Sequence, residues 1–105
     1  MRYNQQVKEA EIQAAILEYL RLRRHFFFRC NSGAFKTQHG SFVRFGTPGC
    51  PDIIGCVDGK FVGLEVKTAK GMLSDDQEAF AASLLAAGGR YHVVRSIHDV
   101  IALGL

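Results

Sequence analysis

Hydrophobic residues in the first part of the chain recur at helical spacing. Ile12, Ile16, Tyr19 and Leu20 fall at i, i+4, i+7 and i+8, which is the stripe of an amphipathic helix. The pattern predicts a helix over residues 7–23 that packs one face against the rest of the protein.

The next segments are short and are broken by turn-forming residues. The aromatic run 25–29 is followed by Asn, Ser and Gly, which predicts a strand that ends in a turn. Residues 34–38 are a polar stretch with no strand prediction, and 41–45 fits another short strand. Glycines and prolines between 46 and 51 then interrupt regular structure.

Two apolar runs, 53–57 and 60–66, are separated by the dipeptide Asp58-Gly59. This arrangement predicts a hairpin with a type I′ turn. The turn places Val57 opposite Lys60.

The C-terminal third predicts a helix, a strand and a second helix. Ser74 and Gln77 have the spacing of a capping box, which predicts that an Ala-rich helix begins here. The helix runs to about residue 87 and ends at the two glycines 88–89. Residues 91–95 predict a strand, and Ser96 caps a last helix through about residue 102. One mixed α/β domain over 1–105, a small sheet flanked by helices, is expected.

Length and charge limit the possible functions. A chain of 105 residues is too short for a two-lobed enzyme with separate cofactor and substrate domains. A formal net charge of +3 favours an anionic partner, although ordinary solvated surface accounts for it equally well. No apolar run approaches the roughly 20 residues that span a bilayer, so we expect a cytoplasmic protein without a membrane partner.

The three cysteines form neither an even set nor a CxxC pair. They therefore indicate neither a disulfide framework nor a zinc site. We expect Cys30, Cys50 and Cys56 to be buried small apolar side chains.

Continued back along both strands, the hairpin register sets Asp52 directly opposite Glu65. Such cross-strand neighbours have Cβ atoms about 4.5–5.5 Å apart, so the two carboxylates destabilise the sheet unless a cation sits between them. Mg²⁺, which binds to few carboxylates and several waters, meets that need. Lys67 projects from the same face as Glu65 because side chains alternate along a strand.

Each of these residues also has an ordinary structural interpretation. Asp52 can cap the turn after Pro51, and Glu65 and Lys67 can form a surface pair that contributes little. Glu65, however, interrupts an otherwise apolar strand, where a carboxylate is costly to bury without a purpose. This favours the metal site.

The first helix has one acid on its apolar stripe. At about 100° per residue, Glu9 projects between Ile16 and Leu20, whereas Glu11 and Glu18 point well away and are expected in solvent. Glu9 is either a first-turn acid favoured by the helix dipole or a third carboxylate that reaches toward the hairpin.

These motifs together resemble the VRR-Nuc domains of the PD-(D/E)xK nuclease superfamily. The resemblance covers most of the chain, and its ordered set of motifs is far more specific than the short Pro-Asp and Glu-x-Lys pattern alone. The matching positions are Glu9, Ile12 and Gln13, the runs 29–33, 49–55 and 65–68, and finally Gly71, Ser74 and Gln77.

The resemblance implies a restriction-endonuclease-like αβββαβ core and metal-dependent hydrolysis of DNA. By position it implies that Asp52, Glu65 and the Val66 carbonyl bind Mg²⁺, for which Mn²⁺ can substitute. It also implies that Lys67 orients the attacking water or stabilises the charge that develops on the phosphate. Glu9 corresponds to the acid that the family carries on its first helix. Gln77 matches a family glutamine, but its side chain fits the capping box equally well.

Among proteins with these motifs, a short free-standing chain such as this one resembles the phage or bacterial homodimers that cut four-way (Holliday) DNA junctions. A less selective or flap-directed nuclease and a non-catalytic DNA-binding module are the alternatives. Phe26–Phe28 and Phe42–Phe45 are candidate dimer contacts, or else core. We expect the following basic residues to contact phosphates: Arg21, Arg24, Lys36, Arg44 and Lys70. The two arginines at the end of the first helix have an alternative role, a favourable interaction with the helix dipole.

Overall fold

The computed structural model describes residues 2–30 and 33–105, and at 2–7, 33–35 and 45 it describes the backbone alone. The elements of this part of the chain are α1 (Arg2–Leu22), β1 (Phe26–Arg29), β2 (Gly33–Lys36), β3 (Phe42–Phe45), β4 (Ile53–Val57), β5 (Lys60–Val66), α2 (Asp75–Ala86), β6 (Arg90–Val94) and α3 (Ile97–Ala102). The fold is mixed α/β.

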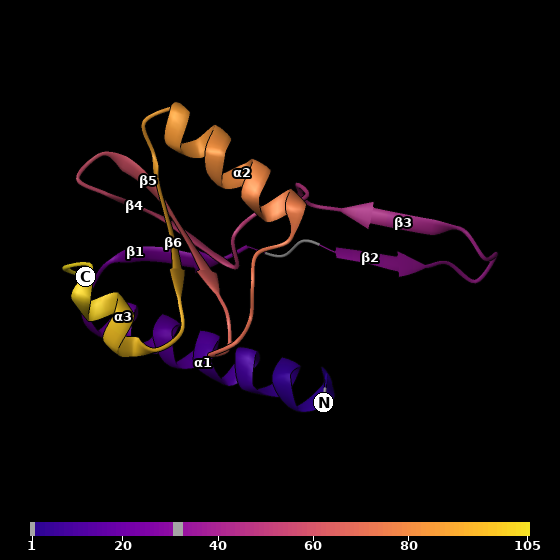
Figure 1. The fold of residues 1–105 in the computed structure, drawn as a ribbon, viewed down its shortest axis with the longest axis horizontal. Coiled ribbons are helices and arrows are strands. Elements are labelled where there is room, and N and C mark those ends of the chain that lie inside the picture. Colours follow the sequence, from indigo (N-terminus) through magenta and orange to yellow (C-terminus); the bar gives the residue numbers. More distant parts are fainter. Residues whose placement is uncertain (1, 31–32) are drawn as a thin grey trace.

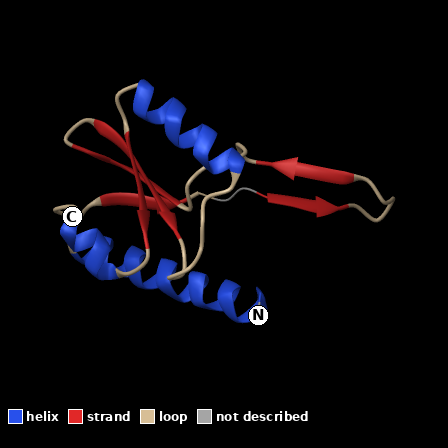
Figure 2. Ribbon diagram, viewed as in Figure 1, coloured by secondary structure: helices blue, strands red, loops and turns tan. Residues whose placement is uncertain are grey.

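Four strands form the main sheet in the order β1-β4-β5-β6. The pairs β1/β4 and β4/β5 are antiparallel, while β5 and β6 run parallel. The connection between the parallel strands contains α2, as such crossovers commonly do. Helices α1 and α3 lie on one side of this sheet and α2 on the other (Figures 1 and 2).

Strands β2 and β3 pair with each other in a two-stranded sheet and form an arm that extends away from the main sheet (Figure 1). The strand at Gly33–Lys36 corrects the sequence analysis, which predicted none there. Its four residues, Gly-Ala-Phe-Lys, are too few to show an alternating pattern. The strand forms through its pairing with β3 across the turn, in which Ala34 lies opposite Arg44 and Lys36 opposite Phe42. Helix α1 also begins earlier than predicted, at Arg2.

The core lies between the sheet and the helices α1 and α3. Ile16 and Leu20 of α1 are at most 1% exposed and cluster with Leu64 of β5 and Val100 of α3. On β5, Val62, Leu64 and Val66 all face this cluster. The residues between them therefore face α2; a Cβ on Gly63 would lie 3.6 Å from Leu84 of α2.

The predicted hairpin and its register are confirmed. Asp58 and Gly59 have φ of 51° and 79°, as a type I′ turn requires. Val57 pairs with Lys60, and Ile53 with Leu64, so one further step along each strand sets Asp52 opposite Glu65. Both of these acids belong to the sheet face that α2 partly covers.

The predicted helix caps are confirmed as well. Ser74 and Gln77 form a complete capping box at the start of α2, and Ser96 Oγ accepts a bond from the Asp99 amide at the start of α3. No helix in the described ranges has the length and apolar character needed to cross a membrane.

Candidate functional site

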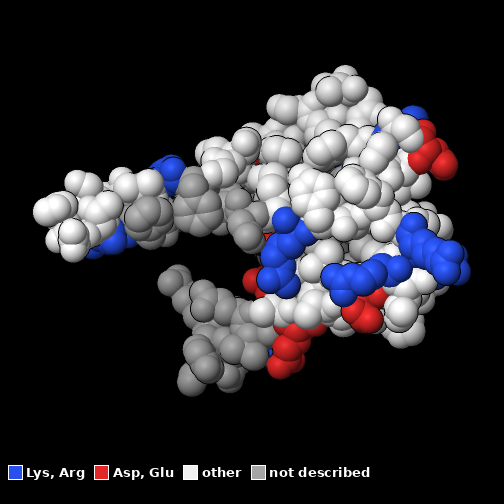
Figure 3. Space-filling model, turned by 180° about the vertical axis from the view of Figure 1, so that it is seen from behind, with Lys and Arg blue, Asp and Glu red and all other residues white. Residues whose placement is uncertain are grey.

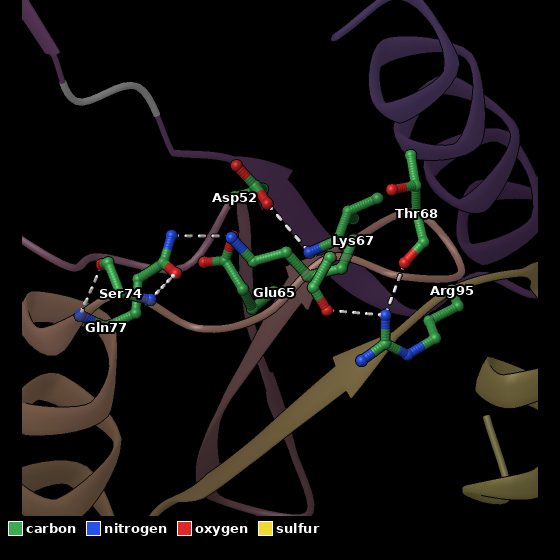
Figure 4. Close-up of polar contacts among 9 residues, drawn as sticks. Asp52, Glu65, Lys67, Thr68, Ser74, Gln77 and Arg95 are labelled. Carbon is green, nitrogen blue, oxygen red and sulfur yellow. Dashed lines mark hydrogen bonds and ion pairs between the residues drawn. The ribbon is translucent and has the colours of Figure 1, made fainter. Parts of the chain in front are cut away.

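A polar cavity of about 310 Å³ opens where α1, β5 and α2 approach one another at the end of the hairpin strands. It brings together residues from four separate parts of the sequence, including all five that the sequence analysis proposed as catalytic. Figure 4 shows several of them. The lining residues are Glu9, Ala10, Gln13, Asp52, Glu65, Val66, Lys67 and Gln77.

Asp52 is held through both its backbone and its side chain. Its carbonyl accepts a hydrogen bond of 2.8 Å from the Cys30 amide, which extends the pairing of β1 and β4. Its Oδ2 accepts one of 2.8 Å from the Val66 amide (Figure 4). The preceding Pro51, opposite Val66, has no N–H to donate to the Val66 carbonyl, while the Val66 amide donates to the Asp52 carboxylate.

Glu65 is a buried acid, 3% exposed. Its Oε2 accepts a bond of 3.3 Å from Gln77 Nε2 and lies 4.0 Å from Lys67 Nζ. Its Oε1 is buried and has no hydrogen-bond partner among the described residues. Burial and, after it, the Asp52 carboxyl raise the pKa of Glu65 to about 9.

Gln77 combines the two roles that the sequence left open. Its Oε1 accepts a bond of 2.8 Å from the Ser74 amide, and its own amide donates to Ser74 Oγ at 3.2 Å. The other end of the same side chain donates to Glu65. The start of α2 therefore positions a donor against the buried acid.

Lys67 extends along the acids with its side chain 14% exposed. The loop that follows it is braced by Arg95, whose guanidinium donates to the carbonyls of Thr68 and Gly71 (Figure 4). Sequence reasoning missed Arg95, since it required knowing that the end of β6 lies beside the end of β5.

Glu9 lines the cavity, as its place on the apolar stripe predicted. Its charge also raises the pKa of Glu65, but less than burial and the Asp52 carboxyl do. Glu11 and Glu18 are exposed, and Glu18 pairs with Arg21 at 3.0 Å. Among the side chains described, no three from His, Cys, Asp and Glu gather closely enough to hold an ion, so Glu9 borders the acid pair without joining it.

The residues present nevertheless fit a hard divalent cation. A buried carboxylate oxygen without a donor is what a bound cation would satisfy, and carboxylate and backbone oxygens are the ligands that Mg²⁺ prefers. Asp52, Glu65 and the Val66 carbonyl are the candidate ligands. The cavity beside them leaves space for waters and for an oxygen of a substrate.

The predicted basic residues lie around the cavity rather than in it. Arg21 and Arg24 line a separate groove beside β1, Lys70 lines a hollow with Thr68 and Arg95, and Lys36 and Arg44 are exposed on the arm. Figure 3 shows basic side chains on the arm and on the adjoining body, with acidic side chains in the angle between them.

The cysteine prediction is wrong in part. Cys56 is exposed, and Cys30 and Cys50 are only partly buried. The two sulfurs lie 2.9 Å apart, because Cys30 continues β1 and Cys50 precedes the Pro51-Asp52 step. Burial, followed by the contact with Cys30, raises the pKa of Cys50 to about 12.

No protein-family model matches the chain, and no curated protein matches it significantly.

Proposed function

We propose that this chain is a metal-dependent endonuclease that hydrolyses phosphodiester bonds of DNA. The observation that carries the proposal is the cavity in which Asp52, Lys67 and the buried, partly unsatisfied Glu65 meet. Two acids and a lysine around a polar space are the groups that metal-assisted phosphodiester hydrolysis uses.

The likeness to VRR-Nuc domains supports the proposal. The motif residues that carry it lie far apart in the sequence, yet Glu9, Asp52, Glu65, Lys67 and Gln77 line one cavity. Apart from the β2/β3 arm and α3, the element order is α1, β1, β4, β5, α2, β6, which agrees with the αβββαβ core that the resemblance implies.

Each residue has a role that follows from its position. Mg²⁺ held by the oxygens of Asp52, Glu65 and Val66 would acidify a bound water and neutralise charge on the phosphate. The Lys67 ammonium, 4.0 Å from Glu65 Oε2, orients the attacking water or stabilises negative charge that develops on the phosphate. The Gln77 amide fixes the rotation of the Glu65 carboxylate.

Branched DNA is the substrate that we propose, cut at four-way junctions by a homodimer. Two-fold symmetry would present two sites to a symmetric junction. Arg21, Arg24, Lys36, Arg44 and Lys70 would contact phosphates and so fix orientation rather than read sequence.

Cleavage assays on a four-way junction, a flap and a linear duplex test both parts of this proposal. With Mg²⁺ or Mn²⁺ present, Asp52→Asn, Glu65→Gln and Lys67→Ala should each lower the rate at least about 100-fold, since loss of mere supporting contacts at metal sites costs 10- to 100-fold. Glu11→Gln, an exposed acid of α1, is the control and should cut normally.

The other outcomes are equally informative. Undiminished cutting by all three variants would remove the site. Equal cutting of duplex and junction would favour a less selective nuclease, and preferred cutting of the flap a flap-directed one. Metal-dependent DNA binding without any product would favour a non-catalytic DNA-binding module.

A further inference from the structure

A row of exposed aromatic rings shares a sheet face with the two acids. Phe28 pairs with Ile54, and Ile54 with Gly63, so these three side-chain positions lie on the side that α2 occupies. Phe26 is two residues from Phe28 and points the same way. Asp52 and Glu65 lie one row further along this face, just beyond the last pair of β4 and β5, and Glu65 is still paired with Val93 of β6.

Helix α2 leaves this part of the face open, because it packs over β6 rather than over the edge strand β1. Phe26 is 68% exposed and Phe28 49% exposed. Their rings meet edge to face with centroids 5.9 Å apart. Phe27 points to the opposite side and packs against the core, so it has the ordinary role of an apolar strand residue and the other two do not.

The charges beside these rings favour a polyanion. Phe26 and Phe28 border a groove of about 620 Å³ at the edge of β1. Arg21 of α1 and Arg24, just after this helix, line the groove from the other side of the sheet, together with Arg29, which alternates with Phe28 and points to the side of Phe27.

The lining of this groove, within the described part of the chain, includes no Asp or Glu. Arg21 pairs with Glu18 at 3.0 Å just outside the lining, so Arg24 and Arg29 supply most of the free positive charge. A second copy docking here about a two-fold axis would bring arginines against arginines, whereas a nucleic acid backbone would neutralise them.

The spacing connects the rings to the acids. Along the strands the acid row lies about 7 Å beyond Phe28 and about 13 Å beyond Phe26, and Asp52 and Glu65 lie about 5 and 10 Å to the side, one and two strands from β1. Stacked nucleotides rise about 3.4 Å each. Two to five nucleotides therefore span the distance from the aromatic rings to the acid pair.

We propose that Phe26 and Phe28 form a stacking platform for unpaired bases of the DNA substrate, with Arg21, Arg24 and Arg29 holding its phosphates. Aromatic side chains stack on bases of any sequence, and a positive groove follows the backbone. The platform rests on the proposed nuclease function and makes it more specific: the bases that stack on the rings are those unpaired at the branch point of the DNA, next to the bond that is cut.

Binding of a fluorescent single-stranded oligonucleotide, measured by anisotropy with the full chain and no divalent metal, tests the platform. Phe26→Ala with Phe28→Ala should weaken binding about 5- to 100-fold per ring. Phe26→Leu with Phe28→Leu keeps apolar bulk but removes stacking and should weaken binding as well. Phe26→Tyr with Phe28→Tyr should bind as wild type does.

Phe42→Ala is the matched control, because Phe42 is 76% exposed but lies on the arm, outside the groove. It should leave binding unchanged. The proposal is overturned if the leucine variant, shown by circular dichroism to be folded, binds single strands as wild type does. It is also overturned if sedimentation shows a dimer that the leucine variant converts to monomer while DNA binding persists, since a second copy then covers the rings.

Failure of the platform and failure of the nuclease proposal give different results. If the leucine variant cuts a flap and a blunt duplex at wild-type rates while Asp52→Asn cuts neither, the platform is wrong and the nuclease stands. If nothing is cut by wild type but the aromatic variants lose single-strand binding, the nuclease proposal fails and the groove remains a binding site.

Discussion

Gln77 holds Glu65 and caps its own helix with the two ends of one amide. Its Nε2 donates to Glu65 Oε2 at 3.3 Å, while its Oε1 accepts from the Ser74 amide at 2.8 Å. Because Oε1 is committed to an N–H donor, the end that faces Glu65 must be the donor. The fold of α2 thus fixes the hydrogen bonding of the candidate site.

Replacing Gln77 by Glu should separate these two roles. Glu at this position keeps an acceptor for the Ser74 amide, and Glu65, with its pKa raised to about 9, is protonated at pH 7 without metal and can donate to the new carboxylate. The free energy of unfolding of the metal-free protein should therefore stay close to wild type at pH 7. The substitution removes the donor to Glu65, so cleavage should fall about 10- to 100-fold. Urea unfolding and cleavage rates measure the two effects.

Two further variants complete that comparison. Gln77→Ala loses both contacts and should also lower the free energy of unfolding by about 1 kcal/mol. Glu78→Gln, an exposed neighbour on α2, should leave cleavage unchanged, and since it removes one acid from the first turn it should lower the free energy of unfolding by about 0.3–1 kcal/mol at most. Wild-type cleavage by Gln77→Glu would show that the contact with Glu65 has no part in function.

The metal-free protein should lose stability as pH rises. Burial and the Asp52 carboxyl raise the pKa of Glu65 to about 9 from an ordinary 4.5. Between those values the folded chain keeps a proton that the unfolded chain releases, so the free energy of unfolding falls with pH. The stabilising contribution is complete below pH 4.5 and is lost as pH passes through about 9.

Thermal or urea unfolding in EDTA from pH 4.5 to 10, with Glu65→Gln as the reference, measures this. The wild-type minus variant difference should decline with pH across that window, because other titrating groups cancel. A flat difference would mean that Glu65 is not protonated in the folded, metal-free protein.

Divalent metal should stabilise the fold, and more strongly at high pH. A ligand at 100 times its Kd that binds only the folded state contributes about 2.7 kcal/mol. Metal binding requires deprotonated ligands, so the increase in Tm on adding Mg²⁺ or Mn²⁺ should be larger at pH 9 than at pH 6. Asp52→Asn and Glu65→Gln should abolish it and Glu11→Gln should retain it; an equal increase in all four proteins would place the metal elsewhere.

Local patterns were sufficient to predict the hairpin and the helix caps. The register that sets Asp52 opposite Glu65 depends on a two-residue turn, and Asp-Gly has few other ways to connect two apolar strands. The angular place of Glu9 on α1 was equally readable, because the helix must bury Ile16 and Leu20.

What the sequence did not predict depends on contacts between distant segments. Strand β2 exists through its pairing with β3, and Arg95 braces the loop after Lys67 only because β6 runs beside β5. The approach of Cys30 to Cys50 likewise follows from the pairing of β1 with β4. None of these has a periodicity or a motif that local analysis could detect.

Arg95 should position Lys67 without touching substrate. Its Nη1 alone donates to two carbonyls of the loop that follows Lys67, and a methionine at this position has no donor to replace it. Arg95→Met should therefore lower kcat about 10-fold with little change in KM. Arg90→Met, at an exposed arginine at the other end of β6, is the control and should be neutral; a change in KM alone would make Arg95 a DNA contact instead.

Gly49 lies between the arm and the candidate site, where the chain packs against the start of α2. Its φ is +78°, and a Cβ there would lie 2.1 Å from the Asp76 carbonyl oxygen, in the first turn of α2. Gly40 has a similar φ of +84° but open space around it. A substitution at either glycine strains the backbone, and only the one at Gly49 also pushes two backbones apart.

Gly40→Ala should therefore lower the free energy of unfolding by about 1–2 kcal/mol, and Gly49→Ala by about 2–5 kcal/mol because overpacking adds to the strain. Gly49→Ala should also slow cleavage at temperatures where it is fully folded, since Asp52 and Gln77 lie on the two segments that it separates. Urea unfolding and cleavage at 15 °C compare the pair. Equal losses of stability in the two variants would show that the loop does not pack against α2 as described.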